Sequence, residues 1–241
     1  MPDQKTHIEV KHPQISIRYL ADYMAASEQA RRTIIRSCKY QPVARIVQHD
    51  EAKRAISKFI RSGRSDISSL QSEAQRLRDR MTDSEFDRDV LDYNADYIDR
   101  FAKVYFDLNL PAAEILAPGK STAVSLYGTK TTCETHFRLR RVTKTNKIRV
   151  GAATLRYAKG KPLSLAVGEW QSALLFGLLS LPGVGEGTEP ELKLCLTVDA
   201  YAGFCYPAPT NAVSRFRNGE AACASIAERW PNIPPPPGAI I

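Results

Sequence analysis

The sequence lacks any long hydrophobic run. No apolar stretch approaches the ~18 residues that a membrane-spanning helix needs. Met1–Lys11 is polar and charged, without the hydrophobic stretch of a signal peptide. These absences lead us to expect a cytoplasmic protein with no membrane partner.

The sequence also lacks the cysteine patterns of disulfide scaffolds and zinc sites. Its five cysteines are scattered, with no C-x-x-C pair and no histidine at zinc-ligand spacing. We expect reduced, mostly buried thiols, and we expect neither a metal nor another cofactor. The cysteines are Cys38, Cys133, Cys195, Cys205 and Cys223.

The composition is that of an ordinary globular protein. Hydrophobic residues make up 43% of the 241 residues and charged residues 25%. A chain of this length forms one large or two small domains and buries a sizeable core without disulfide or metal staples.

Helical periodicity dominates the first half of the chain. Apolar residues recur at steps of three and four, beginning with a helix that Ser16 caps, and the clearest helix is predicted over 83–108. Because the aromatic stripe of that helix follows the helical repeat, we expect it to pack in the core and not to stack on bases. The stripe comprises Phe86, Val90, Tyr93, Tyr97 and Phe101.

Strand-like alternation begins after Pro118-Gly119. It predicts strands over 123–127, 134–142 and 147–157, the last two joined by a turn at 144–146, followed by a buried helix over 163–181. The fold class is therefore α/β, with α+β as the alternative, and the sheet is mixed and led by this hairpin. We expect four segments: a flexible arm over 1–13, a mainly helical region over 14–117, a sheet-containing core with a C-terminal helix over 118–230, and a Pro-rich tail over 231–241.

Positive charge is concentrated in two blocks. Residues 1–64 hold 13 Lys and Arg against 6 acids, and residues 118–160 hold 10 against 1. Nucleic acid is the partner that such blocks favour, because phosphates attract them and release counterions. The alternatives are a solvated basic face, or ion pairs with the acidic region 65–117. The candidate nucleic-acid-binding residues are Arg31, Arg32, Arg36, Lys39, Arg138, Arg140, Arg141, Lys144, Lys147, Arg149, Arg156 and Lys159.

Several motifs resemble the RecB-like PD-(D/E)XK nuclease superfamily. They are the helix start at 15–20, the stretch 150–160 on the second hairpin strand, and Glu169-Trp170-Gln171 on the following helix. In that superfamily an Asp on one hairpin strand and an Asp/Glu-x-Lys on the next bind magnesium, and a helix Gln helps to hold the site. The resemblance therefore implies a nuclease-like fold over the core.

The catalytic residues that this resemblance implies are not intact. Thr154 stands at the metal-binding acid and Arg156 at the lysine, while Gln171 matches the helix motif. Threonine does not replace a carboxylate as a magnesium ligand. Glu134 and His136, two residues apart on one strand face, are the alternative acid/base pair. We expect no catalytic residues of the nuclease type.

The whole chain also resembles a group of bacterial proteins that brings no activity with it. The shared features are the stretch around Arg32–Lys39, a basic hairpin, and A-A-C-x-x-I-A-x-x-W-P at Ala221–Pro231. This resemblance implies a bacterial setting in defence or mobile-element DNA processing.

Three hypotheses remain. The leading one is a non-catalytic nucleic-acid-binding or adaptor protein on a degenerate nuclease-like fold. The second is an active metal-dependent nuclease with relocated ligands, for which Asp92, Asp96 and Asp99 share one helical face. The third is a subunit that binds other proteins through the basic hairpin.

Overall fold

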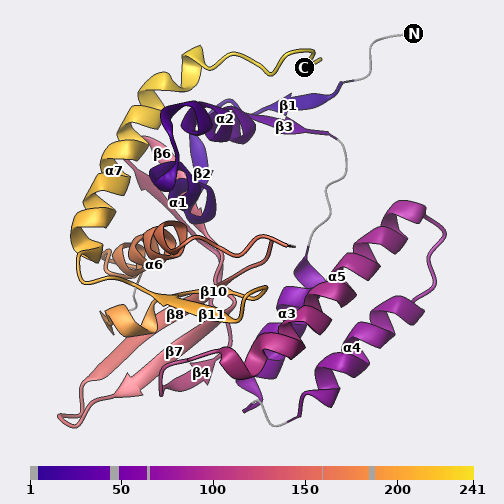
Figure 1. The fold of residues 1–241 in the computed structure, drawn as a ribbon. Coiled ribbons are helices and arrows are strands. Elements are labelled where there is room, and N and C mark those ends of the chain that lie inside the picture. Colours follow the sequence, from indigo (N-terminus) through magenta and orange to yellow (C-terminus); the bar gives the residue numbers. More distant parts are fainter. Residues whose placement is uncertain (1–4, 44–48, 64–65, 159, 185–187) are drawn as a thin grey trace.

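The computed structural model describes residues 5–43, 49–63, 66–158, 160–184 and 188–241. Over these ranges the chain is an α/β protein in which helices cover both faces of a mixed sheet, as the sequence predicts (Figure 1). The helices are α1 (Ile17–Ala25), α2 (Glu28–Lys39), α3 (Asp50–Arg61), α4 (Ser68–Asp79), α5 (Glu85–Val104), α6 (Leu165–Leu179) and α7 (Ala212–Arg229).

The central sheet has the strand order β11-β10-β8-β7-β4, with β9 also paired to β8. The predicted hairpin is β7 and β8, and α6 then crosses over to place β10 parallel to β8. The remaining pairs along the main path are antiparallel. The strands of this sheet are β4 (Glu114–Leu116), β7 (Phe137–Val142), β8 (Ile148–Arg156), β9 (Glu189–Pro190), β10 (Leu196–Asp199) and β11 (Phe204–Pro207).

Two hydrophobic cores lie on opposite faces of this sheet. Side chains alternate along β8, so that Ala152 joins the core with α1, α6 and α7, while Ala153 and Leu155 join the core with α3, α4 and α5. Because both faces are covered, β8 is apolar at nearly every central position, as is typical of strands in a sheet interior. The carboxyl ends of β8 and β10 lie between the two helical layers.

A second sheet was not predicted. It consists of β2 (Gln14–Ser16), β6 (Thr129–Cys133) and β5 (Thr122–Leu126), in the order β2-β6-β5. Of these, only β5 was expected as a strand. The buried positions of β6 include the polar residues Thr129 and Thr131, whose hydroxyls donate to the carbonyls of Cys223 and Thr129, so hydropathy alone gave no strand signal.

The helix over 83–108 exists, but its buried face differs from the predicted stripe. Tyr97 and Phe101 are fully buried, whereas Tyr93 is 43% exposed and the buried stripe instead includes Leu91 and Ile98. The prediction of core packing is confirmed for Tyr97 and Phe101 and is wrong for Tyr93. The helix α5 begins at Glu85, two residues later than predicted, because Ser84 is the N-cap and its hydroxyl accepts the Asp87 N–H.

Described residues of the segments predicted as a flexible arm and a Pro-rich tail form hydrogen bonds with other parts of the fold. Strand β1 (His7–Glu9) pairs with β3 (Tyr40–Pro42), and Ile240 accepts N–H bonds from Thr6 and His7. The buried Lys39 ammonium donates to the carbonyls of Trp230, Pro231 and Ile233 at 2.9, 3.3 and 3.3 Å. A buried ammonium requires such acceptors, and this one holds the chain that follows α7.

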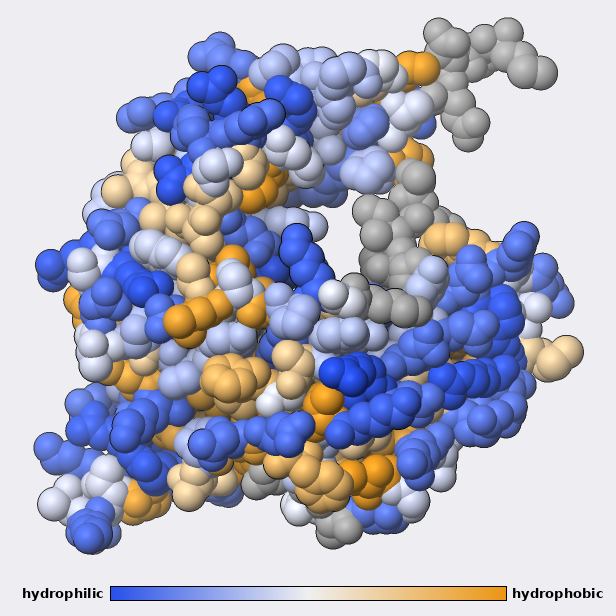
Figure 2. All heavy atoms as spheres, viewed as in Figure 1, coloured by the Kyte–Doolittle hydropathy of each residue, from blue (hydrophilic) through white to orange (hydrophobic). Residues whose placement is uncertain are grey.

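The surface is hollowed between two parts of the molecule. Figure 2 shows an opening between the side formed by α1, α2 and β3 and the side formed by α3 and α5. Within the described ranges, no helix combines the length and apolar character needed to cross a bilayer.

We predict that Lys39→Met destabilises the protein by about 2–4 kcal/mol, because it leaves buried carbonyls without a donor. Urea unfolding followed by circular dichroism measures the change. Arg32→Met, on the exposed face of the same helix, is the control and is expected to cost less than about 1 kcal/mol. Equal losses in both variants would contradict the proposed role of Lys39.

Candidate functional site

The residues at the nuclease-like positions converge at the carboxyl end of β8. Thr154 and Arg156 lie two residues apart, so both side chains face α6. Gln171 of α6 donates from Nε2 to Thr154 Oγ1 at 2.7 Å, and its Oε1 accepts from Arg156 Nη1 at 2.8 Å. The helix glutamine therefore contacts both strand positions.

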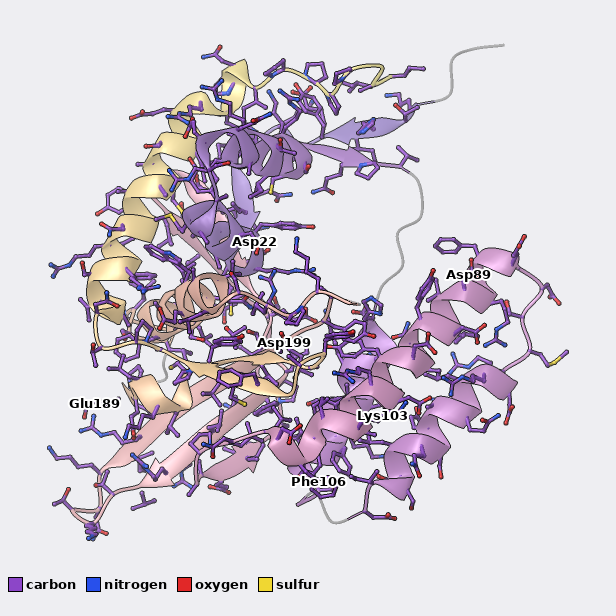
Figure 3. All side chains as sticks on the ribbon, viewed as in Figure 1. Asp22, Asp89, Lys103, Phe106, Glu189 and Asp199 are labelled. Atoms are coloured by element: carbon purple, nitrogen blue, oxygen red, sulfur yellow. The ribbon has the colours of Figure 1, made fainter. Side chains whose placement is uncertain are left out.

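Asp22 of α1 completes this cluster, although no motif in the sequence indicated it. Its carboxylate accepts two bonds from Arg156 Nη2, at 2.9 and 3.0 Å (Figure 3). Arg156 also donates to the Arg18 carbonyl at 3.3 Å, and its side chain is only 12% exposed. Burial lowers the pKa of Arg156, and the nearby Asp22 carboxylate opposes that shift. We call Asp22, Thr154, Arg156 and Gln171 the strand-end cluster.

The strand-end cluster does not fit a magnesium ion. Magnesium sites need carboxylate oxygens with free negative charge, and here the only carboxylate is neutralised by Arg156. Nearby Asp199 is also occupied, because its oxygens accept N–H bonds from Tyr201, Ala202 and Leu163 at 2.9, 3.0 and 2.6 Å. In the described part of the chain, no group of three His, Cys, Asp or Glu residues is arranged to hold a metal.

His136 lies beside Thr154 on the hairpin, one step beyond the Phe137–Ala153 pair. Leu155 N–H donates to His136 Nδ1 at 3.1 Å, and burial lowers the pKa of His136 to about 3. The neutral ring therefore carries its proton on Nε2, which lies 3.9 Å from Glu134 Oε2. At neutral pH Nε2 is a donor and not a general base, which disfavours the Glu134–His136 acid/base pair.

The acids considered as relocated metal ligands are paired with arginines. Arg88 binds Asp92 at 2.9 Å, and Arg78 reaches Asp96 at 3.1 Å and Asp99 at 2.7 Å. These bridges join α4 to α5 or lie along α5. The arrangement favours a structural role for these carboxylates.

The hairpin arginines are compensated by acids of the same chain. Arg140 binds Glu114 of β4 at 3.2 Å, Arg141 binds Glu191, and Arg149 binds Glu189 of β9. Figure 3 marks Glu189 beside the hairpin. Arg138 donates to the Ala117 carbonyl at 3.0 Å. These four residues are therefore less available to phosphates than their sequence pattern indicates.

Two positively charged side chains of the hairpin have no ion-pair partner among the described residues. Lys144 and Lys147 are exposed at the turn, and neither forms an ion pair with an acid of the described residues. Lys159 lies outside the described residues. The hairpin tip, defined here as residues 144–147, is thus one part of the second basic block with uncompensated positive charge.

The candidates in the first basic block likewise include residues that are bonded within the fold and residues that are not. Arg31 donates to the carbonyls of Tyr23 and Met24 at 2.9 and 3.3 Å, and Lys39 is the buried clamp already described. Arg32 is exposed and lies 3.5 Å from Glu28. Arg36 Nε is buried and has no hydrogen-bond partner in the described structure. Arg31 and Lys39 are occupied within the fold.

Comparisons with protein-family models and with curated proteins found no match.

We predict that Asp22→Asn lowers the free energy of unfolding by about 2–4 kcal/mol, because it leaves a largely buried guanidinium without its carboxylate. Chemical denaturation measures this loss. Glu28→Gln removes an exposed partner of Arg32 and Arg229 and is expected to cost less than about 1 kcal/mol. A change in the Asp22 variant no larger than in this control would argue against the cluster as a fixed element.

We predict that His136 makes the protein less stable in acid. Its folded pKa of about 3 lies below the unfolded value of 6.5, so only the unfolded state gains the proton between these values. The stability due to this group is complete above pH 6.5 and falls by about 1.4 kcal/mol per pH unit as the pH drops toward 3. Unfolding of the wild type and His136→Gln from pH 7 to 4 measures this term. Parallel pH profiles would contradict it.

Proposed function

We propose that this protein is a cytoplasmic, non-catalytic nucleic-acid-binding or adaptor protein on a degenerate nuclease-like fold. In the bacterial setting implied by the sequence resemblance, it serves defence or mobile-element DNA processing by holding nucleic acid without cutting it. The observation that carries the non-catalytic part is the Arg156–Asp22 ion pair at the strand-end cluster, in which Arg156 Nη2 donates to both carboxylate oxygens.

The order of elements supports a nuclease-like origin. A hairpin is followed by a helix and a parallel strand, and the helix glutamine Gln171 reaches the second hairpin strand at Thr154. Where magnesium ligands are expected, the chain has threonine, arginine and one neutralised carboxylate. A guanidinium in this position supplies a permanent positive charge where the metal would lie, and it activates no water.

The net charge of +8 supports an anionic partner. Since most hairpin arginines are paired internally, the proposal assigns the hairpin contact with phosphates to Lys144 and Lys147 at the tip. Because this internal pairing leaves few hairpin cations for phosphates, a subunit that binds an acidic protein is the second candidate.

We predict that binding of a labelled 30-nucleotide strand weakens linearly with log salt concentration, because each neutralised phosphate releases counterions. The Lys144→Glu/Lys147→Glu variant is expected to bind more weakly and to lower the slope by about 1–2. Fluorescence anisotropy over a salt series measures both.

The matched control is Lys58→Glu/Lys103→Glu, which makes the same charge change on exposed positions of α3 and α5. A zero slope for the wild type would reject nucleic-acid binding. Equal losses in the two variants would reject the hairpin tip as the contact, and cleavage of the strand in magnesium or manganese would reject the non-catalytic assignment.

A further inference from the structure

Aromatic rings pack together at the carboxyl ends of β8 and β10, where these strand ends meet α5. Tyr157, which follows β8, stacks on Tyr97 of α5 with centroids 3.9 Å apart. His49 meets both rings edge-on at 5.3 and 5.6 Å, and Tyr201 lies 5.7 Å from Tyr157. Arg100 covers the Tyr201 ring at 4.6 Å. These rings form one wall at the carboxyl ends of β8 and β10.

The facing wall is α1, which presents Arg18 and Tyr19. Both are exposed, Tyr19 by 46%, and the Arg18 guanidinium lies 5.8 Å from the Tyr19 ring centroid. No acid in the described ranges forms an ion pair with Arg18. The Arg18 charge therefore remains available to a ligand.

The positive charge of Arg18 affects the pKa values of residues in the aromatic wall. Burial is the main cause that lowers the pKa of His49, and the positive charges of Lys53 and Arg18 lower it further. The same Arg18 charge acts on Tyr97 and Arg156, and Tyr19 acts on Arg156 as well. Arg18 and Tyr19 are thus close to the strand-end cluster and to the aromatic wall.

Two polar atoms of the aromatic wall have no protein partner. Tyr97 Oη and His49 Nδ1 are both buried without a hydrogen bond in the described structure, and Tyr97 is fully buried. Buried polar atoms normally have a partner, and because Tyr97 is fully buried only a small group such as an ordered water fits beside these two atoms. They lie in the wall that faces Arg18.

We propose that the opening between α1 and α3/α5 takes an unpaired stretch of nucleic acid, with a phosphate on the Arg18 guanidinium and a base against the Tyr19 ring. The proposal rests on the proposed function and deepens it by naming single strands as the ligand. An arginine paired with exposed aromatic rings is the combination that binds single strands, because every unpaired base offers a face to stack. A duplex hides these faces, and the hairpin tip can contact either form through phosphates alone.

The test compares a fluorescein-labelled 20-nucleotide single strand with the duplex of the same sequence, as DNA and as RNA. We expect the wild type to prefer the single strand. Arg18→Gln and Tyr19→Ala are each expected to weaken single-strand binding about tenfold while changing duplex binding less than about twofold. Tyr19→Phe keeps the ring and is expected to restore binding.

The matched controls are Arg217→Gln on α7 and Phe106→Ala, which change an exposed guanidinium and an exposed ring elsewhere. As a positive readout, a 4-thiouridine strand is expected to crosslink to Tyr19 or Tyr157 on irradiation. Single-strand affinity unchanged in Arg18→Gln and Tyr19→Ala, together with crosslinks elsewhere, would overturn this inference while leaving the proposed function intact. Absence of binding to every strand and duplex would overturn both.

Discussion

The ion pair between Arg156 and Asp22 is the interaction on which the arrangement of this protein depends. It joins the end of the central strand β8 to helix α1, and Gln171 adds helix α6 to the same cluster. A guanidinium with a 12% exposed side chain is stable only if its donors find acceptors. The bonds from Arg156 to Asp22 hold α1 against the sheet, and they also determine which chemistry the strand end can support.

This environment does not favour a magnesium site for hydrolysis. A magnesium site needs several negatively charged ligands. This strand end instead holds the ion-paired guanidinium of Arg156, the hydroxyl of Thr154 and the amide of Gln171. The pattern extends over the molecule, because the hairpin arginines and the acids of α5 are also neutralised by partners within the chain. The charge left over for a partner is carried by side chains without such pairs, among them Lys144, Lys147 and Arg18.

Local features of the fold could be predicted from the sequence, and long-range pairings could not. Ser16 caps α1, and the turn at 144–146 joins β7 to β8, because these depend on neighbours a few residues apart. The buried α6 was predicted from its apolar composition. By contrast, Lys39 was assigned to nucleic acid because nothing in its neighbourhood indicates the carbonyls, some 190 residues later in the chain, that it binds.

The candidate site follows the same division. Thr154, Arg156 and Gln171 were placed correctly on their strand and helix because these two elements are adjacent in sequence. Asp22 and Glu189 were missed as partners because the chain brings them in from distant segments.

The absence of a metal site at the strand end is tested most directly by calorimetric titration with Mn²⁺ at neutral pH, with Asp22→Asn beside the wild type. We expect no saturable binding in the millimolar range in either protein. A stoichiometric Mn²⁺ site in the wild type that Asp22→Asn abolishes would contradict it.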